Sequence, residues 1–222
     1  MATIIFDADG VLYDSVKKMY DITNQSLQKF NIGPISYQEF RNAYYPTDWT
    51  QTFTKYGLKP NQFDQYLKEY QKNEKILKTS KLIPPKKLFH ILKNNQNHTL
   101  HILTAANQQD IENRLKNDNI KQYFTKIISC NNKCKADNLI EIINSKQNKL
   151  TYFIGDSTAD AQATIEARHQ GTDLTFLGIL HNSIGLNSKR ELHVSSKTKF
   201  DKTIEKRKDK LIYNLSYLAK EL

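Results

Sequence analysis

The sequence has few of the features that mark disulfide-rich, zinc-binding or membrane proteins. Cys130 and Cys134 are the only cysteines, too few for a disulfide framework, and no Cys/His set with zinc-ligand spacing accompanies them. No apolar run approaches the roughly 18 residues that a membrane helix needs. The first residues also lack the basic flank and apolar stretch of a signal peptide. We therefore expect reduced, structural cysteines and a cytoplasmic protein without a membrane partner.

The sequence has fewer acidic than basic residues: it contains 23 Asp and Glu and 33 Lys and Arg, which gives a formal net charge of +10. Such an excess attracts anions, which include phosphorylated metabolites, nucleic acid and acidic membranes, and it does not choose among them. The segment 189–210 alone holds nine Lys or Arg and four Asp or Glu. Its alternating signs favour an exposed helix face, and binding to nucleic acid or acidic lipid is the alternative.

The hydrophobic pattern predicts two kinds of structure. A buried strand at 3–6 is followed, from 16 to about 80, by helical spacing without a good strand. Beyond that point short apolar runs alternate with amphipathic helices, which is typical of a doubly wound parallel sheet. The expected strands are 99–105, 126–130, 150–156 and 174–180, and the expected helices are 108–118, 136–146, 158–170 and one through Leu211, Leu215 and Leu218.

We therefore expect an α/β protein with a Rossmann-like three-layer α/β/α core. The core would comprise 1–14 and 82–222, with a parallel sheet of about five strands in the order 3-2-1-4-5. The residues between, 15–81, would form a small inserted helical cap domain. Within it, Ser36 and Glu39 have the spacing of a capping box that begins a helix. A chain of 222 residues is long enough to bury such a core.

Polar residues follow three of the expected strands, at the edge of the sheet where ligands bind in such folds. Asp7 and Asp9 follow the first strand, and both would point the same way if the strand continued that far. The second strand is followed by 104–107 and the fourth by 156–160. The structural alternatives are a helix N-cap in the former segment and a capping box in the latter.

Carboxylates gathered at one point repel one another unless a cation or a shared proton relieves them. Mg²⁺ prefers a few carboxylate oxygens together with water and a substrate phosphate. A carboxylate can also attack phosphorus and form an aspartyl phosphate. Positive charge is then needed near the phosphoryl oxygens, and Lys133 and Lys135 are the candidates. The sequence thus predicts a Mg²⁺ site and phosphoryl chemistry at this edge of the sheet.

The order of these residues resembles the four motifs of the haloacid dehalogenase-like phosphohydrolase superfamily. The motifs are Phe-Asp7-x-Asp9-Gly-Val-Leu, Leu-Thr104 at a strand end, a loop lysine, and Gly-Asp156-Ser-x-x-Asp160. The helical insertion after the first motif is similar to that of the phosphoglycolate phosphatase-like branch. The resemblance covers residues 3 to about 180, and 181–210 shows none.

The resemblance implies a role for each motif residue. Asp7 would attack the phosphate, while Asp9 would protonate the leaving oxygen and then deprotonate the hydrolytic water. Mg²⁺ would be held by the Asp7 carboxylate, the Asp9 backbone carbonyl and the Asp156 carboxylate, with Asp160 as a further ligand or a partner of one. Contacts to the phosphate or the rest of the substrate would come from Thr104, Ala105, Asn107 and a lysine.

The lysine motif departs from the family pattern, which usually shows Lys-Pro. Lys135, which enters a helix, fits a form without proline, whereas Lys133 fits the spacing of the form with proline. We favour Lys135 as the catalytic lysine and keep Lys133 as a phosphate-binding candidate.

The acid at Asp9 discriminates within the superfamily, because dehalogenase members release a halide that needs no proton and lack this acid. The resemblance therefore implies an oxygen leaving group and a Mg²⁺-dependent phosphatase for a small phosphomonoester, active as a monomer or homodimer. A phosphomutase is the alternative enzyme, and a basic binding protein that uses 189–210 is the alternative from another class. Cap residues would select the substrate, with the candidates Tyr13, Tyr44, Tyr45, Asp48 and Trp49.

Overall fold

The computed structural model describes residues 1–37, 39–40, 53–76, 80–130, 133–145, 150–179, 209–212, 215 and 218. The chain forms two compact units, one made of Met1–Tyr13 with Leu82–Leu222 and the other of Asp14–Lys81. Across the described ranges, no helix is both long enough and apolar enough to cross a membrane.

The first unit is built on a six-stranded parallel sheet with the order β5-β4-β1-β6-β7-β8. Its strands are β1 (Ala2–Phe6), β4 (Thr99–Thr104), β5 (Phe124–Ser129), β6 (Leu150–Gly155), β7 (Thr175–Ile179) and β8 (Lys210–Ile212). Taken in chain order, all but β8 have the expected order 3-2-1-4-5, which confirms the Rossmann-like arrangement. The sheet therefore places β1 between β4 and β6, so the residues that follow these three strands are neighbours.

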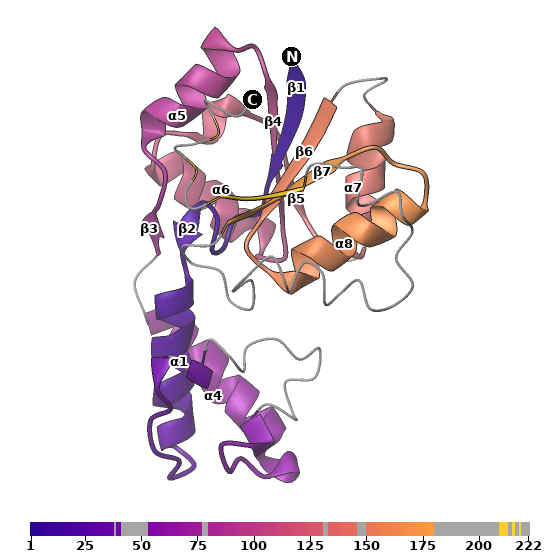
Figure 1. Ribbon diagram of the computed structural model, residues 1–222. Coiled ribbons are helices and arrows are strands. Elements are labelled where there is room, and N and C mark those ends of the chain that lie inside the picture. The colour runs from indigo at the N-terminus through magenta and orange to yellow at the C-terminus, as the bar shows by residue number, and fades with distance from the viewer. Residues whose placement is uncertain are drawn as a thin grey trace. The chain divides into compact units, whose positions relative to one another are not determined.

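Helices cover both faces of this sheet (Figure 1). The helices α5 (Lys86–His90) and α6 (Gln108–Asn117) lie on one side, and α7 (Lys135–Asn144) and α8 (Thr158–His169) lie on the other. Because successive strand residues face opposite sides, Ile4 and Phe6 of β1 pack in one core cluster with Leu115 of α6. Ile5 packs in a second cluster with Leu139 of α7. Burial on both faces explains why β1 is a continuous apolar run.

The helices α6, α7 and α8 each begin at a capping side chain. Asn107 caps α6, Cys134 caps α7, and Ser157 begins α8 in a capping box with Asp160. The three helices match the expected ranges to within two residues at each end. Two short elements complete this unit: a π-helical turn, η2 (Ile91–Asn95), continues α5, and a 3-10 turn, η3 (Lys121–Tyr123), precedes β5.

The expectation of a helix through Leu211, Leu215 and Leu218 was wrong at Leu211, because that residue lies in strand β8 beside β7. Leu215 lies in a 3-10 turn, and Leu218 is helical. The strand is held by Asp209, which forms an ion pair with Arg168 of α8 and accepts a hydrogen bond from the backbone N–H of Phe176 at 2.9 Å. Partners so distant in the sequence leave no trace in the local spacing of leucines. Most of 189–210 lies outside the described residues, so its expected exposed helix stays a prediction.

The second unit contains α1 (Val16–Gln28), the 3-10 turn η1 (Pro60–Gln62) and α4 (Phe63–Ile76), with α1 and α4 side by side (Figure 1). The side-chain amide of Asn73 donates a hydrogen bond to Ser26 Oγ at 3.1 Å across this helix pair. The short strands β2 (Tyr13–Asp14) and β3 (Lys81–Leu82) pair where the chain enters and leaves the unit.

The expected capping box in this unit is confirmed. The backbone N–H of Ser36 donates to Glu39 Oε2 at 2.8 Å, and the backbone N–H of Glu39 donates to Ser36 Oγ at 3.1 Å. Among the expected specificity residues, Tyr13 is a fully buried core residue of the first unit. The others lie outside the described residues: Tyr44, Tyr45, Asp48 and Trp49.

Candidate active site

The loop after β1 separates the first two acids. The strand ends at Phe6, and the Asp7 N–H still donates to Ile154 O of β6 at 2.8 Å. The chain then turns back on itself, since the N–H of Gly10 donates to Tyr13 O at 2.8 Å and the N–H of Tyr13 donates to Ala8 O at 2.9 Å. Because the strand does not continue to Asp9, the argument from strand alternation that Asp7 and Asp9 point the same way does not apply.

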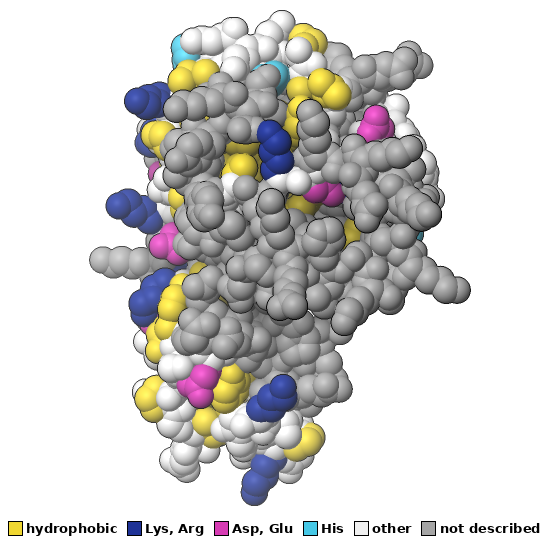
Figure 2. Space-filling model, in the orientation of Figure 1, with side chains coloured by type: hydrophobic (Ala, Val, Ile, Leu, Met, Phe, Trp, Pro, Cys, Tyr) yellow, Lys and Arg dark blue, Asp and Glu magenta, His cyan; other side chains and the backbone are white. Residues whose placement is uncertain are grey.

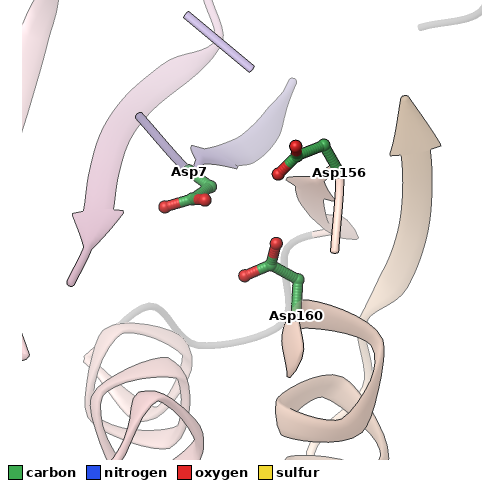
Figure 3. Close-up of side chains that lie close together, drawn as sticks. All are labelled: Asp7, Asp156 and Asp160. Carbon is green, nitrogen blue, oxygen red and sulfur yellow. The ribbon is translucent and has the colours of Figure 1, made fainter. Parts of the chain in front are cut away.

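Three carboxylates meet at this edge of the sheet. Asp7 follows β1, Asp156 follows β6, and Asp160 lies in the first turn of α8. One oxygen from each lies within 4.8 Å of the others, and the side chains point toward one another (Figure 3). Asp7 is 7%, Asp156 4% and Asp160 0% exposed. Three buried acids in one place are costly unless positive charge offsets them.

The acidity of the cluster shows this cost. The pKa of the Asp7 carboxyl is raised to about 7, chiefly by burial, which Lys135 opposes and to which Asp160 and Asp9 add. Burial also raises the pKa of Asp156 well above its usual range, and the neighbouring Asp160 and Asp7 add to the effect. A cation bound among these carboxylates would remove the repulsion that raises both pKa values.

Lys135, the first residue of α7, supplies one positive charge to the cluster. Its Nζ lies 3.2 Å from Asp7 Oδ1 and 2.6 Å from Asp160 Oδ1. Burial alone would lower the pKa of this amine, but Asp160 and Asp7 together raise it above its usual range, so the lysine is charged. Lys133 is placed differently, since it pairs with Glu141 and is 60% exposed. The structure thus brings Lys135, and not Lys133, to the acids.

Asp160 makes more contacts than its neighbours. Its Oδ1 accepts from Lys135, while its Oδ2 accepts from the backbone N–H of Ser157 at 3.2 Å and from Ser157 Oγ at 2.6 Å. The capping box that was the structural alternative is therefore present, and the Asp160 carboxylate also accepts a hydrogen bond from Lys135. In contrast, Asp156 has no ion pair within the described part of the chain. This difference favours Asp7 and Asp156 as direct metal ligands and Asp160 as the residue that orients Lys135.

The segment after β4 lies at the same edge. Thr104 is buried, and its Oγ1 accepts a hydrogen bond from the Ala106 N–H at 3.1 Å. The Asn107 side chain accepts from the Gln109 N–H at 2.9 Å and so acts as the N-cap that was the structural alternative. Ala105 is exposed. The Ala106 N–H and the Asn107 side-chain oxygen are therefore already engaged in hydrogen bonds, and contacts from Thr104, Ala105 and Asn107 to a phosphate stay predictions.

Asp9 has a partner that the sequence reasoning missed. Arg114 of α6 donates from Nη1 to Asp9 Oδ1 at 3.0 Å, across 105 residues of sequence. The only local signal was its position beside Ile111 and Leu115 on the inward face of an amphipathic helix. Such a position is normally apolar, so a charged residue there points to a specific partner.

Two glycines are required by the closeness of the acids. A Cβ on Gly10 would lie 1.9 Å from Asp156 Oδ2, and a Cβ on Gly155 would lie 2.4 Å from the Asp160 Cβ. Gly10 also has a φ of +80°, which other residues rarely adopt. At Gly10 and Gly155 the backbone lies so close to the side chains of Asp156 and Asp160 that a Cβ atom has no room.

Replacing Gly10 by Ala should displace the Asp156 carboxylate and lower hydrolysis by about 10²-fold, because misplacement of about 1 Å in a site has effects of that size. Gly171→Ala is the matched control, since Gly171 has a φ of +88° with no atom within 4 Å of its Cβ position. Both variants should lose similar stability from backbone strain, but only Gly10→Ala should lose activity. Equal activity in the two, measured as phosphate release, would contradict the account.

The residues present fit a Mg²⁺ ion. Hard divalent cations take carboxylate and carbonyl oxygens, and Asp7 and Asp156 offer two carboxylates in a buried cluster that carries one lysine against three acids. The raised pKa values of both acids show the repulsion and burial that a bound cation would offset.

The parallel sheet and the acids and lysine at its edge define an α/β enzyme of the Rossmann-like class. The family model for the haloacid dehalogenase-like hydrolases matches residues 4–172. The chain therefore belongs to the haloacid dehalogenase-like hydrolase family, which confirms the resemblance in the motifs. A search of curated protein sequences finds no match.

Solved structures of this family have the same fold along nearly the whole chain. A haloacid dehalogenase-like hydrolase from Streptococcus pneumoniae has a TM-score of 0.74 at 20% identity, covering 100% of this chain and 99% of its own. A predicted phosphoglycolate phosphatase from Haemophilus somnus has 0.71 at 16% identity, covering 100% and 97%. A predicted β-phosphoglucomutase from Thermotoga maritima has 0.64 at 16% identity, covering 100% and 98%. At these identities the similarity establishes the fold.

Proposed function

We propose that this hydrolase is a Mg²⁺-dependent phosphatase that cleaves a small phosphomonoester through an aspartyl phosphate on Asp7. The observation that carries the proposal is the position of Lys135, whose Nζ contacts both Asp7 and Asp160 in the cluster that also contains Asp156. A buried nucleophile, a fixed cation and carboxylate oxygens that can hold a metal are the parts that phosphoryl transfer needs.

In the first half of the reaction, an Asp7 oxygen attacks phosphorus and the bond from phosphorus to the leaving oxygen breaks. Lys135 Nζ stabilises the negative charge on the transferring phosphoryl group while it holds Asp7 in place. Thr104 Oγ1 and nearby N–H groups orient the phosphoryl oxygens. Asp9 donates a proton to the leaving oxygen, which departs as an alcohol.

In the second half, water attacks the phosphorus of the aspartyl phosphate. Asp9, now deprotonated, takes a proton from this water, and the bond between phosphorus and the Asp7 oxygen breaks. Inorganic phosphate leaves and the Asp7 carboxylate is restored. Asp9 thus serves as acid and then as base. This role fits a carboxylate that lies near Asp7 but is not one of the three clustered acids.

Mg²⁺ would be held by the carboxylates of Asp7 and Asp156 and the backbone carbonyl of Asp9, and when bound it would neutralise charge on the phosphate and the acids. The Ser157 and Lys135 contacts of Asp160 would keep that acid behind the ligands.

Removal of the metal provides the first test. Purified protein incubated with a library of phosphomonoesters should release phosphate from several of them in the presence of Mg²⁺ and from none after treatment with EDTA. Restoring Mg²⁺ should restore the rate, because the metal binds to an already folded site. Phosphate release that is equally fast in EDTA would rule out the metal-dependent reaction.

The same assay separates the alternative functions. A phosphomutase would isomerise a sugar phosphate without net phosphate release. A binding protein would act on no substrate, and its affinity for nucleic acid or acidic lipid would fall with salt. Apart from 209 and 210, the segment 189–210 lies outside the described residues. On the described part of the face in Figure 2, Lys and Arg side chains are dispersed among acidic and apolar ones.

A further inference from the structure

We infer that Arg114 is a positioning residue for Asp9, and that it selects which oxygen of this carboxylate faces the leaving group. The inference rests on the proposed function, because it assigns Asp9 the proton-transfer role described above. It concerns a residue of α6 that lies outside the four motifs and outside the carboxylate cluster.

The ion pair between Arg114 and Asp9 is partly buried and is not a surface salt bridge. Arg114 Nη1 lies 3.0 Å from Asp9 Oδ1, and the two side chains are 15% and 32% exposed. An exposed ion pair contributes little, since solvent screens it and both side chains lose freedom. A largely buried guanidinium on the inner side of a helix is costly without a partner, so its presence here depends on Asp9.

Arg114 is itself fixed in place. Its helix is anchored by Ile111 and Leu115, both fully buried in the first core cluster. Its guanidinium lies 5.7 Å from the centre of the Tyr13 ring, within the range of a cation–π contact. Tyr13 is fully buried and also closes the loop that carries Asp9, through the backbone hydrogen bonds from Gly10 to Tyr13 and from Tyr13 to Ala8. Tyr13 thus contacts both the loop that carries Asp9 and the arginine that binds the Asp9 side chain.

The consequence is an oriented carboxyl group. The hydrogen bond from Arg114 is made to Oδ1, and Oδ2 has no hydrogen-bond partner among the described residues. Oδ2 is thus the oxygen that carries the proton to the leaving group and later receives it from water. Without the arginine the Asp9 side chain would rotate among several rotamers, and fewer of them would present an oxygen to the substrate.

The test compares two substrates that differ in their need for an acid. The leaving group of p-nitrophenyl phosphate departs readily without a proton, whereas that of an alkyl phosphate such as glycerol phosphate does not. Arg114→Met keeps the volume of the side chain but removes the donor. We expect it to lose at least about tenfold more kcat/KM, which reports the steps up to departure of the leaving group, on the alkyl phosphate than on the aryl phosphate. Asp9→Asn should show the same difference, with partial recovery in Arg114→Lys.

Lys116→Met on the exposed side of the same helix is the control and should leave both rates unchanged. Equal losses of kcat/KM on the two substrates, or no loss in Arg114→Met, would overturn the inference, since a structural role would not depend on the leaving group. Failure of the proposed function gives another result, because the wild-type protein would then hydrolyse neither ester.

Discussion

Asp7→Asn should abolish phosphomonoester hydrolysis, with a loss of at least about 10⁴-fold, because a carboxamide cannot form the covalent intermediate and removal of a nucleophile has effects of that size. The variant should nevertheless fold. The amide has the shape of the carboxylate, and burial together with the neighbouring acids already raises the pKa of Asp7 to about 7. Its melting temperature without metal should therefore be unchanged or higher, since one of three crowded charges is gone.

Asp137→Asn is the matched control for this change. Asp137 lies in the first turn of α7, two residues from Lys135, and is exposed. Its substitution makes the same change from carboxylate to amide without touching the carboxylate cluster, so activity should be retained. If Asp7→Asn kept more than a few per cent of wild-type phosphate release, the nucleophile would have to be sought elsewhere.

Lys135→Met should lower hydrolysis by about 10²- to 10³-fold, the size of effect seen when a fixed group that stabilises the transition state is removed. It should also destabilise the protein without metal, because Lys135 is the cation that pairs with both Asp7 and Asp160, and its loss leaves three buried carboxylates together. Phosphate release and thermal unfolding in EDTA measure the two effects.

Lys133→Met tests the competing assignment on the same loop. Lys133 pairs with Glu141, and both side chains are well exposed, so its loss should leave stability unchanged and activity close to that of the wild type. The opposite pattern, in which Lys133→Met is inactive and Lys135→Met is active, would show that the phosphate approaches the other lysine.

Much of the fold is predictable from the sequence because it depends on local pattern. The alternation of apolar runs with amphipathic helices gave the strand order and helix ranges of the first unit, and the buried β1 was visible as an unbroken apolar run. Strand β8 was not predictable in this way. Its place depends on the pair between Arg168 and Asp209, which are 41 residues apart, and the leucines near it are also compatible with a helix.

The site residues likewise include some that the sequence predicts and some that it does not. Acids that follow parallel strands must come close together at one edge, so the grouping of Asp7, Asp156 and Asp160 follows from topology. The choice between Lys133 and Lys135 does not, because it depends on which side of the α7 N-terminus faces the sheet. The role of Arg114 could not be predicted for a similar reason, since only the folded chain shows that this residue of α6 contacts Asp9.

The central claim, a phosphoryl group carried on Asp7, is tested most directly by mass spectrometry of acid-quenched protein. Protein turning over p-nitrophenyl phosphate with Mg²⁺ should gain the mass of one phosphoryl group, located in the peptide that contains Asp7. The label should accumulate further in Asp9→Asn, which lacks the base for the second half of the reaction, and should be absent in Asp7→Asn. Phosphate release with no label on this peptide in the wild-type protein or in Asp9→Asn would contradict the account.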